Sequence, residues 1–232
     1  MTGDTELGEP GETSAPAGGA REPSAAERAH DGIRERIVVG AIRPGQMLSE
    51  NELAAELGMS RTPIRQALAR LQDEGWLTIY PKRGALVREI TPAEARALAD
   101  AAVLLESDGV RGAGARELLA LGPRLAGLVS RHEAALAAGD VDGFVRLTLL
   151  FHRGFVEVGG NPVLLDMYDR LRHRQAMMLL RDRGEILARA AAIVAEHRAL
   201  VGLAASGDAN RFRRALAAHV TETHGELLRA ED

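Results

Sequence analysis

Residues 47–71, MLSENELAAELGMSRTPIRQALARL, decide the fold of this chain. Ser49 precedes a run of helix-forming residues and Glu52 follows three positions later, a spacing typical of a capped helix start. We expect Gly58 to end this helix and Ser60 to open a second one, with a proline in its first turn where a missing N–H costs nothing. Apolar residues at 64, 67, 68 and 71 share one face of the second helix. The stretch therefore predicts two helices joined by a tight turn, with that face in a core.

The other face of the second helix is polar and cationic. Arg61, Thr62 and Arg65 lie on it or at the helix start. Cations and hydroxyls placed in this way can meet phosphates and base edges when a helix enters a DNA major groove. The pattern predicts a recognition helix, and the alternative is a helical hairpin with a charged, solvated face.

The residues after this helix predict a β-hairpin. Strands are expected at 77–80 and 85–90, on either side of a tip at 81–84. The tip carries Arg83 and Lys82, the only lysine in the chain, and its glycine lets the backbone approach DNA closely. A helix-turn-helix followed by a hairpin is a winged helix.

Residues 37–87 resemble the DNA-binding domain of GntR-family bacterial transcription regulators. The elements PG, LA, LG, SRTPIRQAL and EGW occur here in the order typical of that family. The resemblance implies a set of side chains that contact a DNA operator. These are Arg43, Ser60, Arg61, Thr62, Arg65, Lys82, Arg83 and Gly84.

Composition limits what else the chain can be. The hydrophobic content is 46%, yet no apolar run is long enough to span a membrane, and residues 1–20 lack a secretory pattern, so we expect a cytoplasmic protein that acts on the bacterial nucleoid. The absence of cysteine excludes disulfides and thiolate zinc sites. The net charge is −4, so DNA affinity must come from cations concentrated at 61–70 and 82–83 and repeated by dimerisation.

The chain divides into three parts. Residues 1–26 form an acidic tail that is expected to be disordered, residues 27–90 the winged helix-turn-helix, and residues 91–232 an all-helical domain. The sequence TPAE at 91–94 begins the first helix of the third part. Glycines at 109, 112 and 114 are expected to interrupt the pattern, and Pro123 to start the next helix. Further helices are expected at 140–158, 162–181, 185–205 and 208–228, which makes an antiparallel bundle of six or seven helices in a mainly α protein.

The third part resembles the FCD domain found in the FadR-like branch of the same family. Three segments carry the likeness: RLTLLFHRGFVEVGGNPVL, EHRALVGLAASGDA and ALAAHVTETHGELL. Many such domains hold a metal ion on three histidines and on an aspartate four residues before the first of them. The resemblance maps the histidines to His152, His197 and His219, but the aspartate position is Thr148.

A neutral hydroxyl is a poor ligand for a divalent ion. Three neutral imidazoles still suit zinc or a similar divalent metal with an open fourth position, and such a site keeps two positive charges and favours an anion. We therefore expect a metal at His152, His197 and His219, completed by water or by a carboxylate of the effector. The alternative is that these histidines are hydrogen-bonded core residues and that the metal has been lost with the aspartate.

The effector itself is left open by the sequence. Family members commonly carry an arginine four residues before a glutamate in the first helix of this domain, and here that position, relative to Glu106, is Ala102. Arg146, Asn161 and Arg172 are candidate effector-binding residues, although arginines at such spacing also occur as solvated helix faces.

The sequence predicts a transcription regulator and not an enzyme. Two helical domains would pair as a homodimer, so that two recognition helices read an inverted repeat in double-stranded DNA, and a small organic acid would relieve repression. One alternative is a regulator whose bundle only dimerises. Another, which lacks a placed general base, is a zinc hydrolase.

Overall fold

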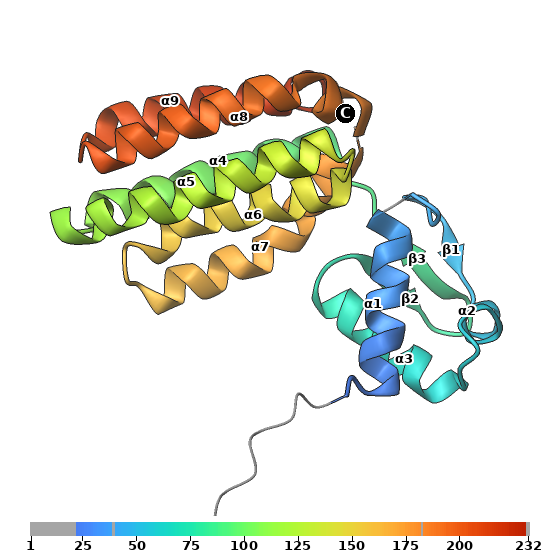
Figure 1. Cartoon of the computed structure of the whole chain (residues 1–232). Coiled ribbons are helices and arrows are strands. Elements are labelled where there is room, and N and C mark those ends of the chain that lie inside the picture. The colour runs from blue at the N-terminus through green and yellow to red at the C-terminus, as the bar shows by residue number, and fades with distance from the viewer. Residues whose placement is uncertain (1–21, 39, 182, 231–232) are drawn as a thin grey trace, which may run out of the picture.

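The computed structural model describes residues 22–38, 40–181 and 183–230 and is mainly helical, as the sequence predicts. A winged helix comes first and an antiparallel helical bundle follows it (Figure 1). The predicted tail falls largely on residues 1–21, which lie outside the described residues. The winged helix comprises α1 (Ala25–Val38), β1 (Met47–Leu48), α2 (Glu50–Glu56), α3 (Arg61–Asp73), β2 (Leu77–Tyr80) and β3 (Gly84–Val87).

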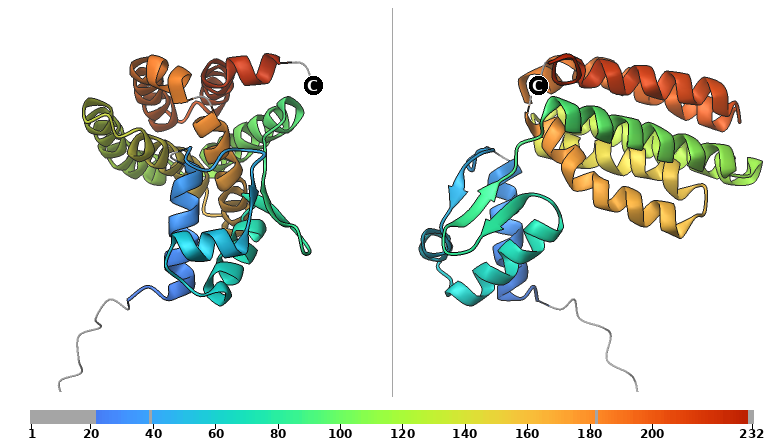
Figure 2. Two further views of the ribbon diagram at one scale, coloured as in Figure 1. Left: turned by 90° about the vertical axis from the view of Figure 1, so that its right-hand side faces the viewer. Right: turned by 180° about the vertical axis from the view of Figure 1, so that it is seen from behind.

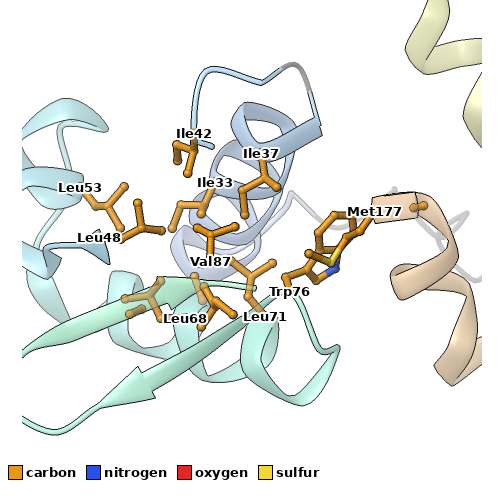
Figure 3. Close-up of a cluster of buried hydrophobic side chains, with 14 of the residues drawn as sticks. Ile33, Ile37, Ile42, Leu48, Leu53, Leu68, Leu71, Trp76, Val87 and Met177 are labelled. Atoms are coloured by element: carbon orange, nitrogen blue, oxygen red, sulfur yellow. The ribbon is translucent and has the colours of Figure 1, made fainter. Parts of the chain in front are cut away.

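The apolar face of α3 lies in the core of the winged helix. Ile64, Ala67, Leu68 and Leu71 are each at most 2% exposed, which confirms the predicted periodicity. They pack with side chains of α1 and the sheet, among them Ile33 (Figure 3). Because each buried aliphatic side chain of this size contributes about 1.5–3 kcal/mol, this face fixes the orientation of the polar face opposite.

The predicted hairpin is present, and a third strand extends it. The strand order is β1-β3-β2, with Met47 opposite Leu86 and Tyr80 opposite Gly84. The return strand ends at Val87, earlier than predicted. Gly84 has φ +111°, and the Cβ of any other residue there would collide with the carbonyl oxygen of Leu48. The missing side chain of Gly84 therefore makes room for β1, a reason that the sequence reading did not foresee.

Helix starts agree with the sequence in most places. The hydroxyl of Thr91 accepts a hydrogen bond from the backbone N–H of Glu94 at 3.2 Å, and the carboxylate of Asp140 accepts one from Gly143 at 2.7 Å. The predicted side-chain cap at Ser49 is wrong, because Ser49 makes no such bond. The start of α2 instead carries two carboxylates in its first turn, which the helix dipole stabilises.

The bundle contains seven helices within the described residues 92–229, in agreement with the predicted six or seven. They are α4 (Pro92–Gly112), α5 (Ala115–Ala137), α6 (Val141–Glu157), α7 (Pro162–Arg181), α8 (Arg183–Ala205), α9 (Ala209–Thr223) and α10 (Gly225–Arg229). The last predicted helix is thus two helices with a break at His224. In the core, the rings of Phe151 and Phe155 pack edge to face with centroids 5.0 Å apart. None of the described helices is long and apolar enough to cross a membrane.

Two predicted boundaries near the first glycines are wrong. Helix α4 continues through Gly109, and α5 begins at Ala115 and contains Pro123 in its interior. Pro123 is exposed, so the carbonyl that loses its helical partner can bind water. Gly109 lies where α4 contacts α6, and its lack of a side chain allows the close approach.

Gly109→Ala is expected to lower the free energy of unfolding by about 1–3 kcal/mol, since its Cβ would collide with the carbonyl oxygen of Phe155 and the Cα of Val156. Gly127→Ala in α5 is the matched control, because no atom lies within 4 Å of the added Cβ. That change is expected to stabilise by about 0.5–1 kcal/mol. Urea unfolding measures both, and equal stability of Gly109→Ala and the parent would contradict the packing explanation.

The winged helix lies at one end of the bundle (Figure 2), and the two domains share a continuous core there. Trp76, which follows α3, is 1% exposed, and its ring centroid lies 6.0 Å from that of His173 in α7. Met177 of α7 lies beside Trp76 (Figure 3). The same cluster holds Leu71 and Val87 of the winged helix. Helix α7 therefore contacts the winged helix directly.

Candidate DNA-binding face and histidine site

The N-terminal half of α3 presents its polar side chains to solvent. Arg61, Thr62 and Arg65 are exposed, and so is Ser60 at the N-cap. The N-terminal residues of a recognition helix are the ones that reach base edges in a major groove. This face is therefore sterically free to make the predicted contacts.

Two of these arginines share a carboxylate of α2. Glu50 accepts a hydrogen bond from Nε of Arg65 at 2.7 Å and from Nη2 of Arg61 at 3.3 Å. The bond from Arg65 is the main reason that the pKa of Glu50 lies below its usual value. Exposed ion pairs contribute little to stability, so Glu50 gathers the two guanidinium groups at one carboxylate with little effect on the fold.

Helix α3 and the wing, which is the β2–β3 hairpin with its tip at 81–83, line one groove. Its volume is about 410 Å³, and its lining includes Arg61, Arg65, Lys82 and Arg83. The structure thus brings together the helix cations and the wing cations predicted from sequence. Arg43 is exposed in the turn before β1 and does not line this groove.

The three histidines predicted as metal ligands come together inside the bundle. His152 of α6, His197 of α8 and His219 of α9 offer nitrogen atoms that all lie within 4.8 Å of one another. They are 8%, 0% and 5% exposed. The Nε2 atoms of His152 and His219 are 3.3 Å apart. Two nitrogens bound to one tetrahedral zinc at about 2.0–2.1 Å are about 3.3 Å apart, so this pair has a suitable spacing.

Two carboxylates orient these rings. Nδ1 of His152 lies 2.7 Å from a carboxylate oxygen of Glu106, and Nδ1 of His219 lies 2.6 Å from one of Glu196. When Nδ1–H donates to the carboxylate, Nε2 keeps its lone pair, as in metal proteins where a carboxylate fixes the ligating histidine. The two facing lone pairs then repel unless a proton or a metal ion lies between them.

Within the described part of the chain, the ring nitrogens of His197 also lack a binding partner. Both of its ring nitrogens are buried and make no hydrogen bond among the described residues, and its ring stacks on Phe151 with centroids 4.1 Å apart. Burial lowers the pKa of His197 well below its usual value and also lowers that of His219. Neutral imidazoles with free lone pairs are the form that binds metal, and unpartnered buried nitrogens are costly. The donor set therefore fits a divalent metal.

A cavity of about 50 Å³ adjoins His152 and His219. Its walls are mostly apolar, with the hydroxyls of Thr148, Tyr168 and Thr223 among the polar groups. The Thr223 hydroxyl is buried and has no partner among the described residues. The cavity is thus adjacent to the histidines and carries hydroxyl groups that a ligand can satisfy.

The predicted effector-binding residues lie elsewhere. Arg146 and Arg172 line a separate cleft between α1, α6 and α7, and the side chain of Asn161 accepts a hydrogen bond from the backbone N–H of Val163 at the start of α7. In the described part of the chain no arginine lines the histidine cavity. An acidic ligand there would have to be held by other groups.

Sequence reasoning missed the contacts of three carboxylates, Glu50, Glu106 and Glu196. Glu50 belongs to α2, and nothing in its own helix signals contact with the arginines of α3. Glu196 directly precedes His197, but successive helical residues point in different directions, and its partner is His219 of α9. The available signal was that Glu196 is an acidic residue next to the predicted ligand His197. Its contact with His219 depends on how α8 and α9 pack.

An exposed cationic groove on a winged helix is typical of a DNA-binding protein, and here a helical bundle that encloses a histidine cluster follows it. Residues 25–87 match the sequence model of the gntR family of bacterial regulatory proteins, and residues 97–222 match that of the FCD domain. The second match covers more than half of the chain. The chain belongs to the GntR family and carries an FCD domain, as the FadR-like resemblance implied.

Individual relatives agree with this assignment. The chain is 29% identical to a helix-turn-helix transcriptional regulator from an unstable DNA locus of Streptomyces ambofaciens, over 85% of this chain and 82% of that protein. It is 30% identical to the gluconate operon transcriptional repressor of Bacillus licheniformis, over 60% of this chain and 57% of the repressor. The solved structure of E. coli McbR/YncC has the same fold, with a TM-score of 0.69 at 22% identity, over 88% of this chain and 97% of that one. The chain is a transcription regulator and not an enzyme.

Proposed function

We propose that this regulator is a homodimeric repressor that binds an inverted-repeat operator and releases it when a small carboxylate binds beside the histidine cluster. In this proposal residues 27–90 bind DNA, residues 91–232 dimerise and bind the effector, and the protein acts on the nucleoid in the bacterial cytoplasm. The observation that carries the proposal is that one helix, α7, contacts both the histidine site and the winged helix.

DNA recognition is proposed to use the groove between α3 and the wing. Arg61, Thr62 and Arg65 would reach base edges, and Lys82 and Arg83 would reach phosphates or a minor groove. The net charge of −4 argues against bulk DNA packaging, and a dimer doubles the few cations that face DNA. The relative that is named a gluconate operon repressor supports repression as the sense of regulation.

The histidine cluster is proposed to hold zinc or a similar divalent ion. A bound ion would supply an electrophilic centre that attracts an anion to the cavity. His197 would contribute one of its two unpartnered nitrogens, while Glu106 and Glu196 would keep His152 and His219 aimed at the ion. Two rigid carboxylate contacts would thus keep the cluster ordered around its ligand.

Coupling to DNA is proposed to run through α7. Tyr168 of α7 donates a hydrogen bond at 3.1 Å to Glu106, the carboxylate that orients His152. Farther along α7, Nε2 of His173 lies 4.0 Å from Glu74, the C-cap residue of the recognition helix. A ligand that shifts Tyr168 would move the contact at Glu74 and bias the dimer between DNA-competent and incompetent arrangements.

Tyr168→Phe tests this coupling. The zinc-loaded protein is titrated onto operator DNA obtained by selection from a random pool, with acetate, gluconate and other small carboxylates as added probes. An effective probe is expected to weaken operator binding by roughly 5- to 150-fold in the parent. The variant is expected to bind the operator as the parent does without probe, and to lose most of the probe effect because the hydroxyl no longer contacts Glu106.

The emission of Trp76, the only tryptophan, reports the same event at the domain interface. It is expected to change with probe in the parent and much less in the variant. An unchanged probe effect in Tyr168→Phe would contradict coupling through α7.

A second candidate is a regulator whose bundle only dimerises. The observation that favours it is that buried Ala102 lines the small cavity at the position where the family commonly has an arginine. If no probe in a broad metabolite panel changes operator affinity, this second function replaces the first.

A further inference from the structure

Thr148 lies at the position where the family's acidic ligand would be, one helical turn before His152 on α6. It is 4% exposed and lines the cavity beside His152 and His219. Its hydroxyl oxygen lies 3.4 Å from Nε2 of His132 in α5, a residue with 0% exposure. The missing carboxylate has therefore been replaced by a hydroxyl with a buried imidazole behind it.

His132 does not line the cavity, and its side-chain hydrogen-bond contact is with Thr148. It packs edge to face against Phe144 and Phe151, with centroids 5.3 Å and 6.1 Å away, and its ring lies 5.1 Å from that of His197. Its nitrogens do not belong to the cluster of three that lie within 4.8 Å of one another. We therefore treat His132 as a positioning residue and not as a ligand.

The hydrogen of the Thr148 hydroxyl is available to a ligand in one tautomer of His132. His132 is buried among aromatic rings, and its neutral imidazole carries a single N–H. If Nε2 carries that hydrogen, it donates to the threonine oxygen, and the threonine hydrogen is free to point into the cavity. Nδ1 of His132 has no partner among the described residues. In this tautomer Nδ1 carries a lone pair and no hydrogen, so no N–H is left without an acceptor. At 3.4 Å the contact is long, which leaves the hydroxyl free to turn.

We propose that Thr148, positioned by His132, is a hydrogen-bond donor that selects a small anion, such as a monocarboxylate, at the open fourth position of the metal site. The inference rests on the metal site proposed above. Three neutral imidazoles leave both positive charges of the ion in place, whereas a carboxylate ligand would remove one. An O–H donor adds to the attraction for an anion, and the charge of the ion disfavours an ammonium group. A cavity of about 50 Å³ admits a group of carboxylate size.

The test uses the full chain loaded with cobalt(II), whose visible absorption reports the ligands around the ion, and acetate as the probe. The parent is expected to bind one cobalt per chain and to change its spectrum with acetate. Thr148→Val keeps the shape and removes the hydroxyl, so it is expected to keep cobalt affinity within about threefold and to bind acetate roughly 10- to 100-fold more weakly, as for a lost hydrogen bond to a charged group. Thr148→Ser is expected to restore acetate affinity.

Two further variants separate the roles. Thr148→Asp is expected to bind cobalt more tightly than the parent and to lose the acetate response, because the carboxylate occupies the fourth position. His132→Phe is expected to keep cobalt and to weaken acetate binding less than Thr148→Val does. Thermal unfolding of the cobalt-loaded variants checks that each is folded.

The outcomes are distinguishable. Equal acetate affinity in Thr148→Val and the parent overturns the donor role of Thr148 and leaves the metal site intact. If His132→Phe loses cobalt and Thr148→Val binds acetate normally, His132 is the fourth ligand of the ion. That result also overturns the donor role of Thr148. A parent that binds no cobalt overturns both this inference and the proposed metal site, whereas the DNA-binding proposal is judged separately by operator binding.

Discussion

Arg65→Ala is expected to weaken operator binding by at least about 30-fold, because both chains of the dimer lose a contact worth about 1–3 kcal/mol. Arg65 lines the groove between α3 and the wing, and its side chain is 61% exposed, so its removal leaves no cavity in the core. Thermal stability is therefore expected to change little. Fluorescence anisotropy of labelled operator, measured at several salt concentrations, gives both the affinity and its salt dependence.

Arg70→Ala is the matched control for this change. Arg70 lies on the same helix, is exposed, and bonds to Glu74 at 3.0 Å, but it does not line the groove. It is expected to keep operator affinity within about threefold, since it lies beyond the N-terminal half of the helix that reads bases. Unchanged affinity and salt slope in Arg65→Ala would remove the assignment of α3 as the recognition helix.

His219→Ala is expected to abolish stoichiometric metal binding. The parent, purified without a histidine tag, is expected to contain about one zinc or similar ion per chain, and the variant less than about one tenth of that, because two remaining imidazoles make a weak site. The free energy that the ion contributes to folding follows its concentration, about 2.7 kcal/mol at 100 times the Kd. Elemental analysis and thermal unfolding with and without a chelator measure both effects.

His224→Ala is the control for the metal experiment. His224 lines the same cavity, but the three clustered histidines do not include it. It is expected to keep the full metal content. A parent without metal, or a His219→Ala variant that retains it, would contradict the proposed site and favour histidines that are held only by Glu106 and Glu196.

Features with a local cause were predictable from the sequence. The apolar positions of α3 and the helix starts at Thr91 and Asp140 depend on residues within one or two turns, and the structure has all three. The boundaries near Gly109 and Pro123 were wrong because a glycine or proline breaks a helix only where its surroundings allow it. Contact with α6 keeps Gly109 in the helix, and exposure to water accommodates Pro123.

In the histidine site, too, some residues were predictable from the sequence and others were not. His152, His197 and His219 were found through the family resemblance, and the structure places them together. The carboxylates that orient two of them come from other helices, as does the imidazole behind Thr148. Such partners depend on which helices are neighbours and on their rotation about their own axes. A single sequence does not encode these in any local pattern.

The most direct test of sequence-specific dimeric regulation is selection of bound DNA from a random double-stranded pool, followed by measurement of the number of chains on the selected sequence. We predict that an inverted repeat is enriched and that two chains bind it together, with half-sites spaced to suit two recognition helices. Recovery of unrelated sequences with equal affinity, or binding of one chain to an asymmetric site, would contradict the proposal.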